Sequence, residues 1–384
     1  MNNRCLWYFK VSLGIVLFSV LSSLLCYAQY PTVEIVELRL DSQHNYNMKY
    51  GVTGRVIASP HWTKSGTSEI VFYPKNANVN IDAKFELSEV WGGGYKTLYL
   101  RANHESDLEV EGTVTLSNGM HQFDFEQVLN STAGVITNNK IGGETLDFDW
   151  EYSWDDITWS SAGSTSNPCY ITFAKPIAPW STDGYNGIPV YVEIMYSACT
   201  AMNGKSTISE ALEALPGAVY SYMTYDGSQH FTFYGINEDF HIREFVIRST
   251  PDHGPPSMND CRDFACFVEC LCSAIGISNN EIMHLAPKFF THWIKPAPGQ
   301  QPRNTEWNFH VVDFITESPY QKIADASLLL DGDNDFNNGF TGNGILSKYN
   351  CTKGQYILKL VLSGSVTDQN IWTTCVLSET RFTP

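Results

Sequence analysis

The first half of the chain, from residue 32 to residue 171, alternates apolar and polar residues in short runs. Such period-two alternation is typical of strands that bury one face and expose the other. The clearest runs are residues 33–40, 79–87 and 108–116. Clusters of Asn, Gly, Ser and Asp separate the runs and supply turn signals. Many short strands divided in this way predict an antiparallel β-sandwich rather than an alternating α/β domain.

The pattern changes near residue 175, after prolines at 168, 176 and 179. Apolar residues then recur at helical spacing, and we expect helices over 190–203 and 208–215. The aromatic-rich stretch 231–248 predicts strands. The fold class is therefore expected to be α+β, with a β-sandwich domain over 30–175 followed by a mixed domain over 176–384. The chain is long enough for two independent cores.

A further helix is predicted over 259–277, and both of its ends are marked in the sequence. Asn259 or Asp260 can cap its start, and Asp263 stands where the acid of a capping box would. Gly276 supplies the C-terminal stop. Apolar residues then share one face of the helix, and Cys261 lies on that face in the first turn.

A thiol in the first turn of a helix is suited to act as a nucleophile because backbone N–H groups point toward it. These groups and the helix dipole favour thiolate over thiol, so we expect a lowered pKa for Cys261. The same N–H groups can hold an oxyanion. The carboxylate of Asp260 would oppose the thiolate if it faced the sulfur, and would oppose it less as a helix cap.

Two later strands offer partners for this thiol. The stretch 307–314 carries His310, and the stretch 323–330 returns with Asp325. Across such a hairpin Asp325 can orient the imidazole and set its tautomer. Nucleophile, base and orienting carboxylate then follow one another in the order Cys261, His310, Asp325, which is the general pattern of an activated nucleophile.

The residues around these positions resemble the transglutaminase-like superfamily over roughly 185–340. The resemblance is carried by Cys-Arg-Asp-Phe-Ala at 261–265, Phe-His-Val at 309–311 and Ile-Ala-Asp-Ala at 323–326. It implies a papain-like α+β core, a catalytic triad of Cys261, His310 and Asp325, and acyl transfer through a thioester on a protein or peptide substrate.

Three functional outcomes stay open at this point. We favour hydrolysis of peptide or amide bonds, as in a cysteine peptidase or deamidase. A cross-linking transglutaminase would share the same chemistry until an amine, not water, resolves the thioester. The alternative from another class is a non-catalytic surface-binding protein that retains the scaffold.

The N-terminus predicts export. Arg4 and Lys10 precede an apolar run over 11–25 that ends near Ala28, which is typical of a secretory signal peptide over residues 1–29. The run is too short to span a membrane, so we expect a secreted, periplasmic or cell-surface protein with no stable membrane span. In an oxidising compartment Cys351 and Cys375 are a reasonable disulfide pair.

The net charge of the chain limits the kinds of partner that we expect it to bind. Lys and Arg number 24 against 41 Asp and Glu, and a formal net charge of -17 excludes nucleic acid as an expected partner. Aromatic residues of the first half are interpreted as core filling rather than a carbohydrate platform. They include Trp150, Tyr152, Trp154 and Trp159.

Two sets of candidate metal ligands are weighed against simpler interpretations. Asp331, Asp333 and Asp335 resemble the start of a Ca²⁺ loop, but Phe336 stands where the sharp turn needs Gly. We interpret this stretch as a solvated turn, with Ca²⁺ as the alternative. Cys266, Cys270 and Cys272 lack a Cys-x-x-Cys pair and are interpreted as small buried residues. The expected chemistry requires no cofactor.

Overall fold

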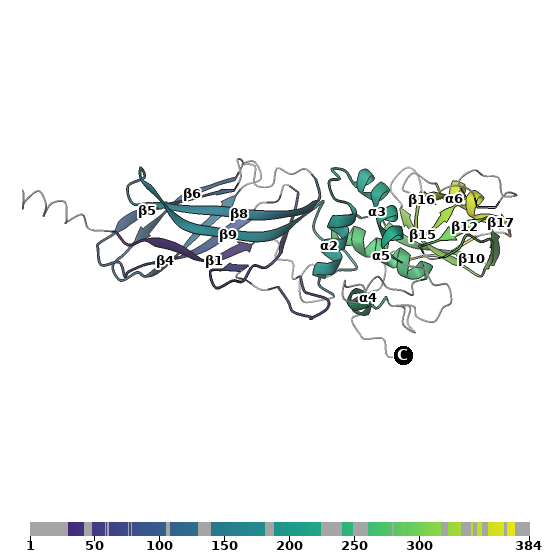
Figure 1. Ribbon diagram of the computed structural model, residues 1–384, viewed down its shortest axis with the longest axis horizontal. Coiled ribbons are helices and arrows are strands. Elements are labelled where there is room, and N and C mark those ends of the chain that lie inside the picture. The colour runs from purple at the N-terminus through teal and green to yellow at the C-terminus, as the bar shows by residue number, and fades with distance from the viewer. Residues whose placement is uncertain are drawn as a thin grey trace, which may run out of the picture.

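The computed structural model describes most of the chain outside the N-terminus. The described residues are 30–41, 48–57, 59, 61–75, 77, 79–104, 108–129, 140–180, 188–223, 240–248, 260–278, 280–286, 288–298, 300–315, 322–331, 339–340, 344–347, 352–364 and 367–372. The predicted signal peptide, the Cys351 and Cys375 pair, Asp333 and Asp335 lie outside them. Figure 1 shows an elongated α+β molecule with strands at one end and a helix-covered sheet at the other.

The N-terminal half consists of two sheets packed face to face. One has the strand order β2-β1-β4-β7 and the other the order β3-β9-β8-β5-β6. The strands are β1 (Val33–Asp41), β2 (Trp62–Thr63), β3 (Val71–Pro74), β4 (Val79–Leu87), β5 (Lys96–His104), β6 (Leu108–Leu116), β7 (Gln122–Leu129), β8 (Gly142–Ser153) and β9 (Trp159–Thr172). Every neighbouring pair is antiparallel except β3 and β9, which are parallel, so the expectation of a purely antiparallel sandwich was wrong at this edge.

The core of this half follows from the alternation in the sequence. Along β4 every second residue is buried, from Val79 to Leu87, and the residues between them are half-buried. Phe85 of one sheet meets Trp150 of the other edge to face at 5.4 Å, so the two inner faces share one apolar core. Trp150 is fully buried, as the core interpretation requires. Trp154 instead is half-buried and forms a cluster of stacked rings with Tyr30 and Trp91.

The C-terminal half builds a mixed layer of helices and antiparallel sheet. The larger sheet has the order β12-β15-β14-β10-β18 with β16 beside β15, and the smaller has the order β13-β11-β17. Its strands are β10 (Asn280–Ala286), β11 (Phe289–Thr291), β12 (Ile294–Pro296), β13 (Glu306–Trp307), β14 (His310–Ile315), β15 (Lys322–Leu330), β16 (Ile345–Ser347), β17 (Val361–Ser363) and β18 (Thr367–Trp372). Its helices are α2 (Val192–Ala201), α3 (Ile208–Tyr222), α4 (Ile242–Arg248), α5 (Cys261–Ala274) and α6 (Lys353–Leu360). None of the helices among the described residues is long and apolar enough to cross a membrane.

Several predicted elements differ from the observed ones. The end of the stretch expected as strands, Ile242–Arg248, is the helix α4, because Ile242, Phe245 and Val246 are buried together at helical spacing. Helix α3 runs through Pro216 to Tyr222, beyond the predicted end, and Thr207 and Glu210 form a capping box at its start. Trp307 belongs to the small sheet rather than to the strand of His310.

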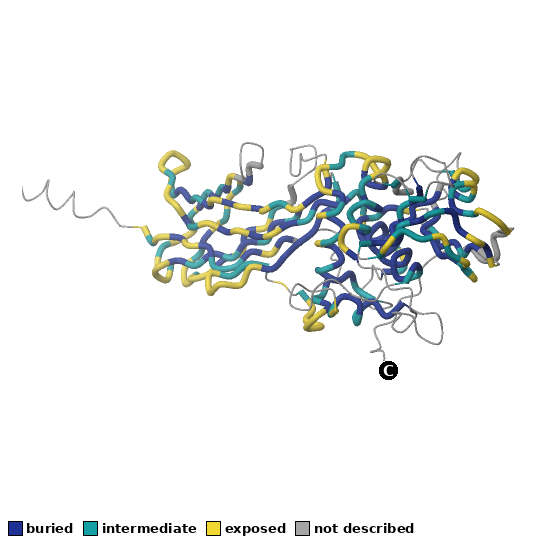
Figure 2. Tube along the Cα trace, turned by 45° about the vertical axis from the view of Figure 1, so that its right-hand side comes forward, coloured by how far each residue is buried: buried dark blue, intermediate teal, exposed yellow. Residues whose placement is uncertain are grey.

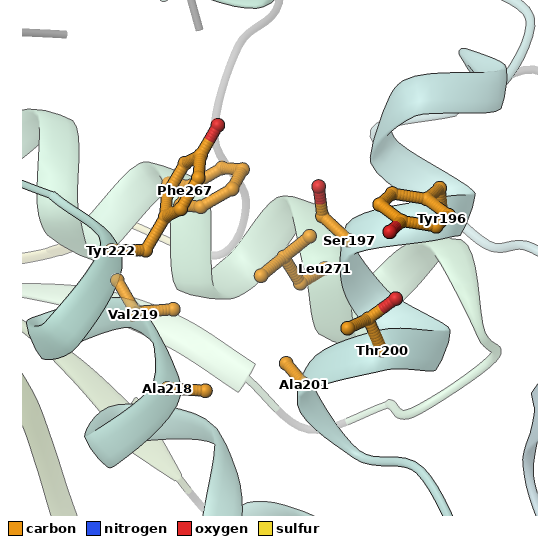
Figure 3. A pocket seen from close by; sticks show the side chains of 9 residues that line it. All are labelled: Tyr196, Ser197, Thr200, Ala201, Ala218, Val219, Tyr222, Phe267 and Leu271. Carbon is orange, nitrogen blue, oxygen red and sulfur yellow. The ribbon is translucent and has the colours of Figure 1, made fainter. Parts of the chain in front are cut away.

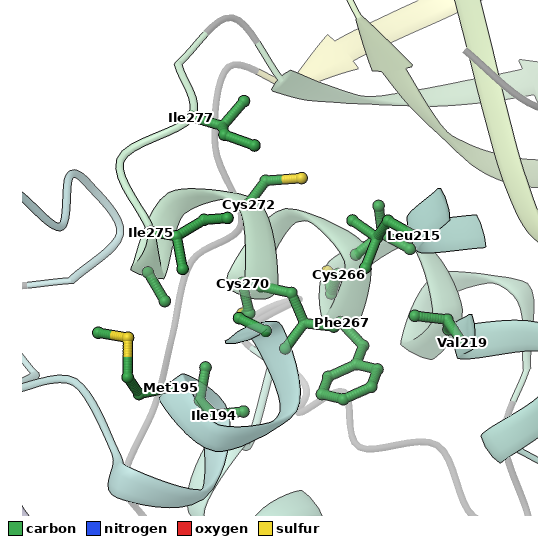
Figure 4. Close-up of a cluster of buried hydrophobic side chains, with 14 of the residues drawn as sticks. Ile194, Met195, Leu215, Val219, Cys266, Phe267, Cys270, Cys272, Ile275 and Ile277 are labelled. Carbon is green, nitrogen blue, oxygen red and sulfur yellow. The ribbon is translucent and has the colours of Figure 1, made fainter. Parts of the chain in front are cut away.

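Helix α5 is surrounded rather than amphipathic. All of its residues except Arg262 are buried, although the sequence predicted a single apolar face. The sheet strands β14 and β15 pack on one side, and α2 and α3 pack on the other, so both sides of α5 face protein. Figure 4 shows Cys266, Cys270 and Phe267 among apolar side chains of these neighbouring helices. Figure 2 shows buried segments running through both halves of the molecule.

The sandwich has an apolar core of its own, and a second apolar cluster crosses from the first half into the C-terminal half. Met48, Phe72 and Ile141 of the first half belong to the same apolar cluster as α2 and α5. The segment after β9 also binds the end of α5. Trp180 Nε1 donates to the Cys270 carbonyl at 3.1 Å, and a Cβ on Gly276, whose φ is 78°, would lie 2.6 Å from the Cβ of Ala174. The segment that follows the sandwich therefore contacts the C-terminal end of the helix that begins at Cys261.

Candidate active site

Asp260 caps the helix that carries the thiol, as the sequence predicted. Its Oδ1 accepts hydrogen bonds from the backbone N–H groups of Arg262 at 2.8 Å and Asp263 at 3.1 Å. Asp263 completes the capping box by accepting from the Asp260 N–H at 3.1 Å. Cys261 is therefore the first residue of α5, at the positive end of the helix dipole.

The thiol of Cys261 is nevertheless buried, with 6% of the residue exposed. Burial raises its pKa well above the ordinary value, and the negative charges of Asp260 and Asp325 add to the rise. The backbone N–H of Val311 and the charge of Arg262 act in the opposite direction. The expectation of a lowered pKa was therefore wrong, because desolvation of the buried thiol is the largest cause acting on its pKa.

His310 and Asp325 meet across the β14–β15 hairpin. The two strands are antiparallel, with Asp313 opposite Ala324, which places His310 and Asp325 on a diagonal of the same face. His310 Nε2 lies 2.8 Å from Asp325 Oδ2, and both side chains are 1% exposed. Burial alone would raise the pKa of Asp325. The charge of His310 and the hydrogen bonds that Asp325 accepts lower this pKa below the ordinary value. Asp325 thus remains an anion that can orient the imidazole.

Asp325 receives further hydrogen bonds that the sequence did not predict. Its Oδ1 accepts from the Ser327 N–H at 2.8 Å and from Ser327 Oγ at 2.6 Å. Its Oδ2 accepts from the hydroxyl of Tyr356 on α6. The capping box of Thr352 and Gln355 is a sequence signal for the start of α6. No local pattern, however, links Tyr356 to Asp325, since the contact is purely tertiary.

The second imidazole nitrogen of His310, Nδ1, is not engaged by Asp325. His310 Nδ1 is buried and makes no hydrogen bond to any described residue. The ring of Trp307 covers His310, with centroids 4.7 Å apart and planes 31° from parallel. The backbone N–H of Val311 reaches the Cys261 sulfur. Burial is the main cause that raises the pKa of Asp260, and His310 acts in the opposite direction. The starts of α5 and β14 are therefore neighbours.

The predicted Ca²⁺ ligands are only partly described. Asp331 is buried, but its proposed partners at 333 and 335 lie outside the described residues. In the described part of the chain, no group of three or more His, Cys, Asp or Glu side chains is placed to hold a metal ion. Cys266, Cys270 and Cys272 lie in the apolar cluster around α5, as interpreted from the sequence.

A pocket of about 200 Å³ opens on another side of the same helix. Phe267 and Leu271 of α5 form one wall, and residues of α2 and α3, including Tyr196 and Tyr222, form the others (Figure 3). None of the predicted catalytic residues lines it.

No protein-family model matches the chain, and no curated protein matches it. Cys261, His310 and Asp325 are therefore candidates on their geometry and chemistry.

Proposed function

We propose that this protein is an exported thiol enzyme of the transglutaminase-like kind, which hydrolyses peptide or amide bonds through a thioester on Cys261. The buried pair of His310 and Asp325 beside the start of α5 carries the proposal. Burying an imidazole and a carboxylate costs free energy that an apolar pair would not. Such pairs recur where a base must be oriented toward a nucleophile.

In the first step the Cys261 thiol proton passes to Nδ1 of His310. The sulfur attacks the amide carbonyl carbon, and the carbonyl π electrons move to the oxygen. Asp260 already occupies the N–H groups of Arg262 and Asp263. We therefore assign the oxyanion to the N–H of Cys261 itself rather than to the wider first turn of the helix.

In the second step the C–N bond breaks and the leaving amine takes the proton from His310. A thioester remains on Cys261. Water then attacks this thioester, His310 accepts the proton of the water, and the carboxylic acid leaves as the thiol is restored. A lysine amine in place of water would give a cross-link, so a transglutaminase differs only in this last nucleophile.

A non-catalytic binding protein is the second candidate, and one observation favours it. The Cys261 sulfur is buried and its pKa is raised, which are features of a structural cysteine. In that case the β-sandwich would bind the partner, and the thiol fold would be a scaffold.

Alkylation of Cys261 by iodoacetamide across pH separates these functions. Peptide mapping reports modification of Cys261 alone, and buried Cys199 in the same digest is the internal control. If His310 acts as a base, Cys261 reacts below about pH 8.5, the ordinary thiol range, and His310→Ala slows it by about tenfold or more. An equal rate in the wild type and in His310→Ala would overturn the enzyme proposal.

A further inference from the structure

One oxygen atom of the site is shared between two donors. Asp325 Oδ2 lies 2.8 Å from His310 Nε2 and also accepts the hydroxyl proton of Tyr356. The other oxygen, Oδ1, is held by the backbone and side chain of Ser327. Tyr356 comes from α6, which is distant in sequence from both β14 and β15.

We propose that Tyr356 is a positioning residue that fixes the Asp325 carboxylate and limits how strongly this carboxylate holds a proton on His310. The inference rests on the proposed function. It adds a fourth side chain, outside the stretch that resembles the transglutaminase-like superfamily, to the proposed triad.

The hydroxyl of Tyr356 is held in place by packing. Its ring is fully buried in the apolar cluster that includes Val312, Phe314 and Leu360. The same cluster joins α6 to the face of the sheet on which His310 and Asp325 meet. A hydroxyl mounted on a packed ring has little freedom to leave Asp325, so it constrains the carboxylate rather than adapting to it.

Sharing the oxygen has a chemical consequence. Each donor to Oδ2 takes up part of the negative charge on that atom, so the hydroxyl of Tyr356 weakens the pull of Asp325 on the imidazolium. Without the hydroxyl, the carboxylate would favour protonated His310, which cannot accept the thiol proton. The titratable groups that interact with the pair from the elements packed around it are Asp260 and Cys261 at the start of α5 and Tyr356 on α6.

Tyr356→Phe removes the hydroxyl and keeps the packed ring. Tyr73→Phe is a matched control, because Tyr73 is equally buried and donates its hydroxyl to the Leu40 carbonyl at 2.8 Å in the sandwich. We expect Tyr356→Phe to move the acidic midpoint of Cys261 alkylation up by about 0.5 pH unit, which is about a threefold slower reaction below the midpoint. Tyr73→Phe should leave the midpoint unchanged.

Ser327→Ala provides a second test if Tyr356→Phe folds poorly by circular dichroism. It removes one donor from Oδ1 and keeps the backbone donor, so we expect a smaller shift in the same direction. The inference is overturned if folded Tyr356→Phe keeps the wild-type midpoint, if Tyr73→Phe shifts it equally, or if Ser327→Ala, measured in its place, leaves it unmoved. Any of these three outcomes overturns the role of Tyr356 but not the proposed function, provided that His310→Ala still slows alkylation of Cys261. If His310→Ala has no effect on alkylation, the proposed function itself fails.

Discussion

The two halves of the molecule bury different kinds of side chain. Apart from Glu69, whose carboxylate pairs with Arg55, the buried polar residues identified in the sandwich half are the neutral Ser153, Thr165, Asn167 and Thr172. The C-terminal half buries Asp263, Glu269, His310, Asp313, Asp325 and Asp331, together with two further histidines. Because ionisable groups are costly to bury, their concentration in the C-terminal half sets it apart from the sandwich half and agrees with the site proposed there.

Asp313 shows the difference most clearly. Neither of its carboxylate oxygens makes a hydrogen bond to a described residue, and the residue is fully buried. Burial, followed by the negative charge of Glu269, raises its pKa well above the ordinary value. In the sandwich, by contrast, the buried acid Glu69 accepts two hydrogen bonds from the Arg55 guanidinium.

The largest effect should come from the sandwich core. Trp150→Ala removes a fully buried side chain that contacts rings of both sheets, and we expect it to lower the free energy of unfolding by about 3–5 kcal/mol. Urea denaturation followed by tryptophan fluorescence and circular dichroism measures the loss. Under conditions where the variant stays folded, the alkylation rate of Cys261 should not change. A slower rate there would show that the halves are not separable in role.

An intermediate effect is expected at Asp313. A raised pKa means that the folded state binds a proton more tightly than the unfolded chain, so the resulting stability is complete below about pH 4 and is lost as pH rises toward the folded pKa. Asp313→Asn cannot ionise, and we expect it to gain about 1 kcal/mol relative to the wild type between pH 5 and pH 8. Urea denaturation of both proteins at several pH values measures this difference. The prediction fails if the free energies of unfolding of the two proteins change with pH in the same way across this range.

The smallest effect belongs to the sandwich surface. Arg39 contacts Asp82 at 3.2 Å, and their side chains are 44% and 27% exposed. Solvent screens such a pair, so Arg39→Met should change the free energy of unfolding by about 0.5 kcal/mol or less, and added salt should remove even that change. Denaturation at low and high salt checks it, and a loss as large as that at Trp150 would mean that surface charge contributes to this half.

Prediction from the sequence was most accurate for elements that bury one face and turn the other toward solvent. The runs at 33–40 and 79–87 are strands because their alternation reflects one buried face and one face that is half-buried or exposed. Helix α5 was located correctly by its caps, but its burial on both sides was not predicted. Helix α4 was misread because its aromatic and branched residues favour strands locally, while its packing requires helical spacing.

By itself the sequence determined the capped start of α5 and the placement of Cys261 there. It also determined that a strand carrying His310 and then a strand carrying Asp325 follow this helix. Caps and alternation are local, and neighbouring residues suffice to set them. Only the tertiary structure decided that the thiol is desolvated, that Val311 reaches its sulfur, and that Tyr356 shares an oxygen of Asp325 with His310. Desolvation and side-chain hydrogen bonds depend on what packs from distant parts of the chain, and no local pattern encodes that.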